Sequence, residues 1–107
     1  MNYIASPYSH PSSEMRQWRY EAVNAYTVAR IKQGACCISP IKYLHNDAVE
    51  HQLPLDALFW HSFNMQLLRR ADAIEVLCIP GWEESKGVQS EMQIAEHLGI
   101  PILFART

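Results

Sequence analysis

The chain has 107 residues, of which 49% are hydrophobic and 19% are charged. This length and composition predict one globular domain over residues 1–107 and exclude a disordered chain. Nine basic and eleven acidic side chains give a net charge of −2, so the chain lacks the cationic surface by which nucleic-acid polymers are bound.

The hydrophobic residues fall in short runs. None approaches the roughly 18 residues that cross a bilayer, and the N-terminal segment has neither a basic stretch nor a long apolar core. We therefore expect no membrane partner, no signal peptide and a cytoplasmic location. Cys36, Cys37 and Cys78 lie in apolar runs, which predicts buried, reduced thiols. The histidines lack metal-ligand spacing, so we expect neither a metal nor an organic cofactor.

The first predicted unit is a strand, a loop and a long helix. The strand covers Asn2–Ala5, and Pro7 and Pro11 bracket the loop over residues 6–11. Ser12 or Ser13 can cap the helix, and Gly34 ends it. Helical spacing predicts an apolar face made of Met15, Trp18, Ala22, Ala25 and Ala29.

A second strand is predicted over residues 36–39, and Pro40 ends it. Residues 41–52 fit either a loop or a short helical turn. Pro54 suits the first turn of a further helix. The expected inward face of that helix consists of Leu55, Phe59, Phe63 and Leu67.

Residues 74–79 form the clearest strand. A loop runs from Pro80 to Ser85, and a helix follows to about Leu98. Gly99 and Pro101 end it before a last strand over residues 102–104. The expected inward residues of this helix are Val88, Met92, Ala95 and Leu98.

Strands that alternate with helices predict a parallel α/β sheet with right-handed crossovers. The expected fold is a small three-layer, flavodoxin-like domain with strand order 2-1-3-4. Open sheets of this kind bind ligands beyond the strand carboxyl ends, where the strand order reverses. The loops at residues 6–11 and 80–86 are therefore expected to line the binding site.

The second of these loops enters a helix, whose free N–H groups and positive dipole end favour an anion. Ser85 either caps this helix or offers its hydroxyl to a ligand. Glu91 lies in the first two turns, where we expect the dipole to favour its ionised form. It is either a solvated surface residue or a functional carboxylate, acting as a nucleophile or as an acceptor for sugar hydroxyls.

The run from Ser85 to Glu91, with Ala95 after it and Asp72-Ala73 before the preceding strand, resembles a signature of the nucleoside 2-deoxyribosyltransferase-like superfamily. The start, Tyr3-Ile4-Ala5-Ser6-Pro7-Tyr8, is similar to that superfamily's first strand and loop. The likeness spans Tyr3 to Phe104, and it is closest to small bacterial and phage members with a Gly-Trp pair before the serine, here Gly81-Trp82.

The resemblance implies a reaction. Glu91 would attack the anomeric carbon of a 2-deoxyribose and displace the base, and Tyr3 would position that carboxylate. Water or a second base would then resolve the glycosyl-enzyme ester. Hydrolases of nucleoside monophosphates carry serine at the position of Ser85, whereas transferases acting on free nucleosides carry aspartate. The resemblance therefore implies an N-glycosidase acting on nucleosides or nucleoside monophosphates, in a homodimer or larger homo-oligomer.

One residue departs from the superfamily pattern. Asn64 stands where a carboxylate usually assists protonation of the leaving base, and an amide cannot supply that proton. Asp56 or Glu83 could compensate. A non-catalytic nucleotide-binding module therefore stays open as an alternative, and so does deoxyribosyl transfer, which Ser85 disfavours. The remaining candidate substrate-binding residues are Ser6, Gly87, Asn64, the possible base-stacking side chains Tyr8 and Trp82, and His10 as a phosphate contact.

Overall fold

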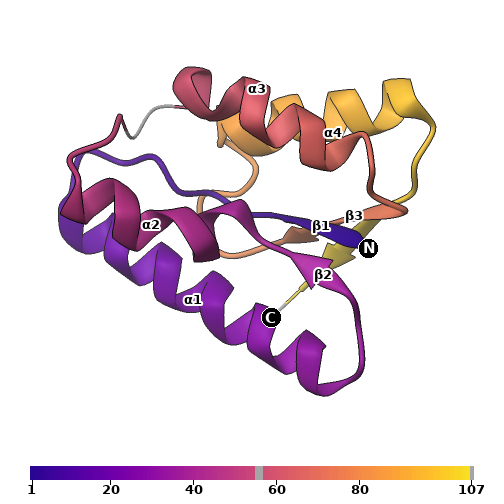
Figure 1. Cartoon of the computed structure of the whole chain (residues 1–107), viewed down its shortest axis with the longest axis horizontal. Coiled ribbons are helices and arrows are strands. Elements are labelled where there is room, and N and C mark those ends of the chain that lie inside the picture. Colours follow the sequence, from indigo (N-terminus) through magenta and orange to yellow (C-terminus); the bar gives the residue numbers. More distant parts are fainter. Residues whose placement is uncertain (55–56, 107) are drawn as a thin grey trace.

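The computed structural model describes residues 1–54 and 57–106 (Figure 1). Within these residues, four strands form one parallel sheet in the order β2-β1-β3-β4. This is the predicted α/β fold with the predicted strand order. The strands are β1 (Asn2–Ala5), β2 (Cys37–Ile38), β3 (Ala73–Leu77) and β4 (Ile102–Ala105).

Helices cover both faces of the sheet, which gives three layers (Figure 1). The helices α1 (Ser13–Lys32) and α2 (Pro40–Glu50) lie on one face. The helices α3 (Ala57–Leu68) and α4 (Lys86–Leu98) lie on the other. Along β1 the side chains alternate between these layers. Tyr3 packs in the α3–α4 core, whereas Ile4 packs in the α1 core.

Local signals in the sequence explain most helix ends. The Ser12 hydroxyl accepts a hydrogen bond from the Met15 N–H and so caps α1, and Gly34 follows that helix with a φ of +87°. Gly99 ends α4 with a φ of +74°. Within the described parts of the chain, no helix combines the length and apolarity needed to cross a membrane.

The ambiguous segment after the second strand is a complete helix. Ser39 accepts a hydrogen bond from the Lys42 N–H, and Pro40 occupies the first helical position, so α2 begins there and continues to Glu50. The Ser-Pro pair is a helix-start signal, and it resolves the choice between loop and helical turn in favour of a helix.

The predicted inward face of α1 is wrong except at Ala22, which packs partly buried against the core. Met15 and Trp18 are 37% and 47% exposed, whereas Val23 and Thr27 are fully buried. The helix turns a partly polar face to the sheet because Tyr26 and Arg30 bind the buried carboxylate of Glu75 on β3. Apolar spacing alone therefore identified the wrong stripe.

Three smaller expectations also need correction. Phe63 on α3 and Leu98 on α4 are 47% and 41% exposed, whereas Val88 and Ala95 are buried as predicted. Of the other residues in the predicted α3 face, Leu55 and the Phe59 side chain lie outside the described residues. The thiols are free but not buried, because Cys36 is exposed and both Cys37 and Cys78 are partly exposed.

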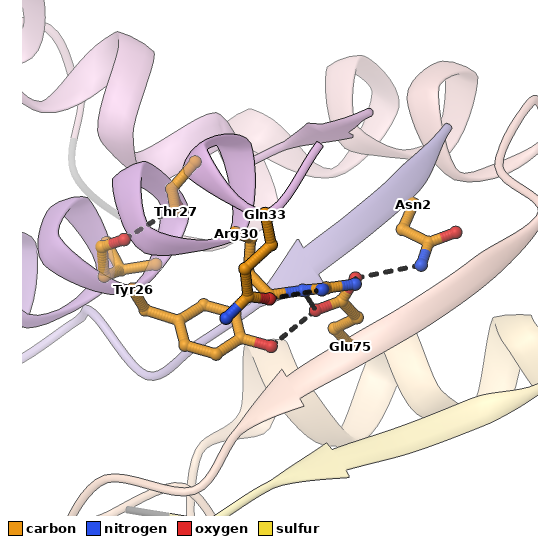
Figure 2. A network of polar contacts seen from close by, with 7 residues as sticks. Asn2, Tyr26, Thr27, Arg30, Gln33 and Glu75 are labelled. Atoms are coloured by element: carbon orange, nitrogen blue, oxygen red, sulfur yellow. Dashed lines mark hydrogen bonds and ion pairs between the residues drawn. The ribbon is translucent and has the colours of Figure 1, made fainter. Parts of the chain in front are cut away.

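Glu75 on the central strand β3 is 2% exposed and forms the centre of a polar network (Figure 2). Its carboxylate accepts hydrogen bonds from Arg30 at 2.8 and 3.0 Å, from the Tyr26 hydroxyl at 2.5 Å and from the Asn2 amide at 2.9 Å. Burial raises the pKa of Glu75, but these hydrogen bonds outweigh burial and lower it overall. The network therefore fixes α1 against β1 and β3.

Candidate active site

A cavity of about 750 Å³ opens beyond the carboxyl ends of β1 and β3. The loop after β1 contributes Ser6 and residues 8–11 to its wall, and the segment before and into α4 contributes Gly81 and residues 84–87. Both loops that topology selects therefore line one pocket. Side chains from α1, α2 and α3 complete it, so the pocket draws on helices from both faces of the sheet.

Glu91 lies in the second turn of α4 and lines this pocket. The hydroxyl of Tyr3, which is fully buried on β1, donates a hydrogen bond to Glu91 Oε2. Burial raises the pKa of Tyr3 well above its ordinary value, and the adjacent Glu91 charge raises it further. Tyr3 therefore keeps its proton and remains a donor that orients the carboxylate.

The environment of Glu91 contradicts the expectation that the helix dipole favours its ionised form. Burial raises the pKa of Glu91 to about 7, although the hydrogen bond from Tyr3 lowers it in part. The dipole acts mainly within the first helical turn, and Glu91 lies beyond that turn. Desolvation therefore dominates, and near neutral pH the group exists in both protonation states.

The N-terminus of α4 faces the pocket with Ser85, Lys86 and Gly87. Ser85 is the N-cap, and its Oγ accepts a hydrogen bond from the Val88 N–H at 3.2 Å. Its own hydroxyl proton stays available to a ligand because capping uses the oxygen as an acceptor. The two alternatives for Ser85, a helix cap and a ligand contact, are therefore compatible in this geometry.

Two arginines from the start of α1 also line the pocket, although no motif in the sequence predicts them there. The Arg16 guanidinium donates to the backbone carbonyl of His10, and Arg19 Nη1 donates to that of Ser9 at 3.0 Å. Arg19 Nε is buried and has no hydrogen-bond partner within the described residues. A buried, unpaired donor on a cation favours an anionic ligand. Gly81 lies directly against this guanidinium.

Two further polar atoms of the pocket are buried and have no partner in the described part of the chain. They are Ser6 Oγ, on a side chain of a residue only 5% exposed, and Asn64 Oδ1 on α3. Leaving such groups unpaired costs about 1–3 kcal/mol each, which a bound ligand or water removes. Both predicted contact residues therefore offer unused hydrogen-bonding capacity to the pocket.

Tyr8 lines the pocket beside His45, for which the sequence predicted no role in the site. His45 on α2 is 4% exposed, and its Nδ1 lies 2.5 Å from the Tyr8 hydroxyl oxygen. The ring of Tyr20 stacks on the imidazole with centroids 4.4 Å apart. No short sequence spacing links these residues, since they come from a loop and from two different helices.

Trp82, a possible base-stacking residue from the sequence, does not line the pocket. Its ring packs against Phe104 at 5.6 Å, and Arg106 lies over it. Trp60 from α3 lines the pocket instead. His10 lines the pocket as expected, and its Nδ1 accepts a hydrogen bond from the Ser12 N–H.

Neither carboxylate that could replace the general acid absent at Asn64 is seen among the described residues of the pocket. Asp56 lies outside the described residues, and Glu83 does not line the pocket, whereas its neighbour Glu84 does. Asp72 binds the α-amino group of Met1 at 2.5 Å and does not line the pocket.

The described residues also contain one group with metal-ligand geometry. Ligand atoms of Asp47, Glu50 and His51 lie within 4.8 Å of one another at the exposed end of α2. None of the three lines the pocket that contains Glu91. Exposed acidic groups are common without a bound ion, so the cluster alone does not define a site.

The open parallel sheet places the chain in the α/β class, in which small ligands usually bind beyond the strand carboxyl ends at the switch point of the sheet. Within that class, the chain belongs to the family described as a domain of unknown function, DUF1937, which matches residues 1–106. A comparison with curated proteins finds no match.

Proposed function

We propose that this protein is an N-glycosidase of the nucleoside 2-deoxyribosyltransferase-like superfamily that cleaves the base–sugar bond of a nucleoside or nucleoside monophosphate. The observation that carries the proposal is the hydrogen bond from buried Tyr3 to Glu91 inside the pocket. It orients one carboxylate at the wall of the pocket, as attack on an anomeric carbon requires.

In the proposed reaction, a Glu91 oxygen attacks the anomeric carbon while the bond to the base breaks. The bonding electron pair leaves with the base, which takes up a proton. Water then attacks the anomeric carbon of the ester, which releases the sugar and restores the carboxylate. Tyr3 acts throughout as the donor that orients Glu91.

The cationic side of the pocket supports a monophosphate as the substrate. Arg16 and Arg19 line the same cavity as the N-terminus of α4, where Ser85 offers a hydroxyl. Guanidinium groups and helix N–H groups are the usual partners of phosphate oxygens. An aspartate at the position of Ser85 would repel a phosphate, so serine there also favours a monophosphate over a free nucleoside.

Asn64 favours a second candidate, a nucleotide-binding module without turnover. Its amide lines the pocket where a proton donor to the leaving base is expected. Without such a donor the base must leave as an anion or take its proton from water, and both routes are slow.

Chromatography of free base separates these candidates. Wild type, Glu91→Gln and the control Glu96→Gln, an exposed glutamate on the same helix, are incubated with a panel of deoxynucleosides and deoxynucleoside monophosphates. The glycosidase predicts base release by wild type and by Glu96→Gln but none by Glu91→Gln. Nucleotide binding without release in any variant supports the binding module, particularly if Asn64→Asp then releases base. Base exchange only with a second base indicates transfer.

A further inference from the structure

A chain of hydrogen bonds runs from the surface of α1 to the pocket. Gln17 Nε2 donates to Glu21 Oε1 at 3.2 Å, and Gln17 Oε1 lies 2.9 Å from His45 Nε2. The other imidazole nitrogen, Nδ1, lies 2.5 Å from the hydroxyl oxygen of Tyr8. Both Tyr8 and His45 line the pocket.

The donor and the acceptor of each hydrogen bond in this series follow from the bond at Glu21, the surface residue where the series begins. Glu21 Oε1 accepts the hydrogen bond from the amide nitrogen of Gln17, so the amide oxygen of Gln17 faces His45. An amide oxygen also only accepts, so His45 Nε2 carries a proton.

The inner half of the chain depends on the charge of His45. Burial lowers the pKa of His45, and the positive charge of Arg16 lowers it further, so the ring is neutral at neutral pH. A neutral imidazole has one proton, which is on Nε2, so Nδ1 accepts a hydrogen bond from the Tyr8 hydroxyl. The stacked Tyr20 ring holds the imidazole in this plane.

The hydrogen bond to His45 determines which polar group Tyr8 presents to a ligand. A phenol has one hydroxyl proton, and Tyr8 uses it in the hydrogen bond that it donates to His45. Only the lone pairs of the Tyr8 oxygen are then left for a ligand. A free tyrosine could turn its hydroxyl to suit a donor or an acceptor. Here the hydrogen bonds from Gln17 through His45 fix the orientation of the Tyr8 hydroxyl. A ligand acceptor atom placed against this oxygen would therefore face a lone pair.

We propose that Tyr8 is a specificity-determining residue that accepts a hydrogen bond from an N–H or O–H group of the ligand, and that Gln17 and His45 hold it in that role. The identity of the ligand as a nucleotide rests on the proposed function. The donor is then an amino group of the base or a hydroxyl of the sugar, and not an ionised phosphate oxygen. In this role Tyr8 makes a polar contact with the ligand, whereas the sequence suggested stacking on a base as one possibility.

The imidazole tautomer of the free protein tests the first step without any ligand. Long-range ¹H–¹⁵N correlation spectra assigned with His45→Gln report which ring nitrogen is protonated at neutral pH. The expected result is a neutral ring with the proton on Nε2. A proton on Nδ1 overturns the proposal, because Tyr8 would then accept from His45 and turn its own proton toward the pocket.

Binding measurements test the second step and distinguish the two sources of the donor. Deoxycytidine and deoxyadenosine monophosphates are compared with the deoxyuridine and deoxyinosine analogues, in which an oxygen replaces the amino group. Each deoxynucleotide is also compared with its 3′-deoxy analogue. One of these comparisons is expected to show about a tenfold preference for the donor-bearing ligand, the usual worth of one hydrogen bond.

Tyr8→Phe keeps the ring and removes the acceptor, so it is expected to abolish that preference while leaving the affinity for the weaker ligand nearly unchanged. A preference that survives in Tyr8→Phe, or no preference in wild type, overturns this inference while leaving the proposed function intact if base is released. Failure of every nucleotide to bind overturns the proposed function, whereas the tautomer result still decides the polarity of Tyr8.

Discussion

Burial and hydrogen bonding act on Glu91 in opposite directions, and burial dominates. Its pKa of about 7 exceeds the ordinary value of 4.5. A nucleophilic carboxylate must be ionised, so a glycosidase that uses Glu91 works only in the fraction of molecules that have lost this proton. The same burial makes the ionised carboxylate more reactive, because fewer water molecules solvate it.

The pH dependence of base release follows from this value. The rate is expected to rise with pH through about 7, because Glu91 loses its proton there. The hydrogen bond from Tyr3 lowers the pKa of Glu91, so Tyr3→Phe is expected to move this limb to higher pH and to reduce the rate. A pH–rate profile of both proteins measures the shift. An unchanged limb in Tyr3→Phe would contradict the role assigned to Tyr3.

The raised pKa of Glu91 also carries a stability prediction. Between pH 4.5 and about 7 the folded state holds this proton and the unfolded state does not, so stability falls as pH rises through this range. Glu91→Gln is therefore expected to gain up to about 3 kcal/mol relative to wild type above pH 7. Urea unfolding at pH 5 and pH 8 measures the gain, with Glu96→Gln as the control. An equal effect at both pH values would refute it.

At the residue scale, the sequence located the site residues whose position follows from a strand end. Ser6 follows β1, and Ser85 begins the helix after β3, so chain order alone brings them to one edge of the sheet. Arg16, Arg19 and His45 reach the pocket through the packing of α1 and α2, which no local pattern encodes.

The loop before α4 depends on one glycine. Gly81 has a φ of +95°, and a Cβ there would lie 2.4 Å from Arg19 Nη2. Gly81→Ala therefore strains the backbone and displaces a guanidinium of the pocket. We expect weaker binding of deoxynucleoside monophosphates, with a smaller loss for the free nucleosides. Calorimetric titration measures the ratio, and Gly34→Ala, where nothing lies within 4 Å of the added carbon, controls for strain alone. Equal losses of affinity for both ligands would show that Arg19 does not contact the phosphate.

The attachment of α1 to the sheet depends on the Glu75 network (Figure 2). Arg30→Ala removes the cation from a carboxylate that is 2% exposed. We expect a loss of about 3 kcal/mol, toward the lower end for a broken buried pair because the Arg30 side chain is 28% exposed. Lys32→Ala, an exposed change on the same helix, is the control. Equal losses in the two variants, measured by urea unfolding, would contradict the assignment.

The same network has a pH dependence of known sign. The pKa of Glu75 is lowered in the folded state, so its contribution is complete above the unfolded value of about 4.5 and is lost as pH falls through the lower folded value. Wild type is therefore expected to lose more stability than Arg30→Ala between pH 5 and pH 3.

At the element scale, periodicity and capping residues predicted α1, α3 and α4 and the buried residues Val88 and Ala95 of α4, but not the buried face of α1. The face of α1 was misassigned because Glu75 draws Tyr26 and Arg30 inward, and that carboxylate lies 45 residues beyond Arg30 in the chain. A buried polar network reverses the usual apolar rule, and only the paired strand and helix together reveal it.

At the scale of the whole molecule, alternation of strands and helices was enough to predict the sheet order and hence the edge where the pocket lies. The contents of the pocket required the assembled fold. Glu91 comes from one face of the sheet, and the arginines and His45 come from the other, so the chemistry exists only when both layers are packed. A ligand that spans the pocket would link the two layers.

In the proposed reaction, Glu91 forms a covalent bond to the sugar. Intact-protein mass spectrometry after rapid acid quenching of a turnover reaction tests it directly. We expect a protein species heavier by one deoxyribosyl-phosphate group, with the ester mapped by peptide sequencing to Glu91 and missing from Glu91→Gln. Base release that continues in Glu91→Gln, or an adduct mapped to another residue, would contradict it.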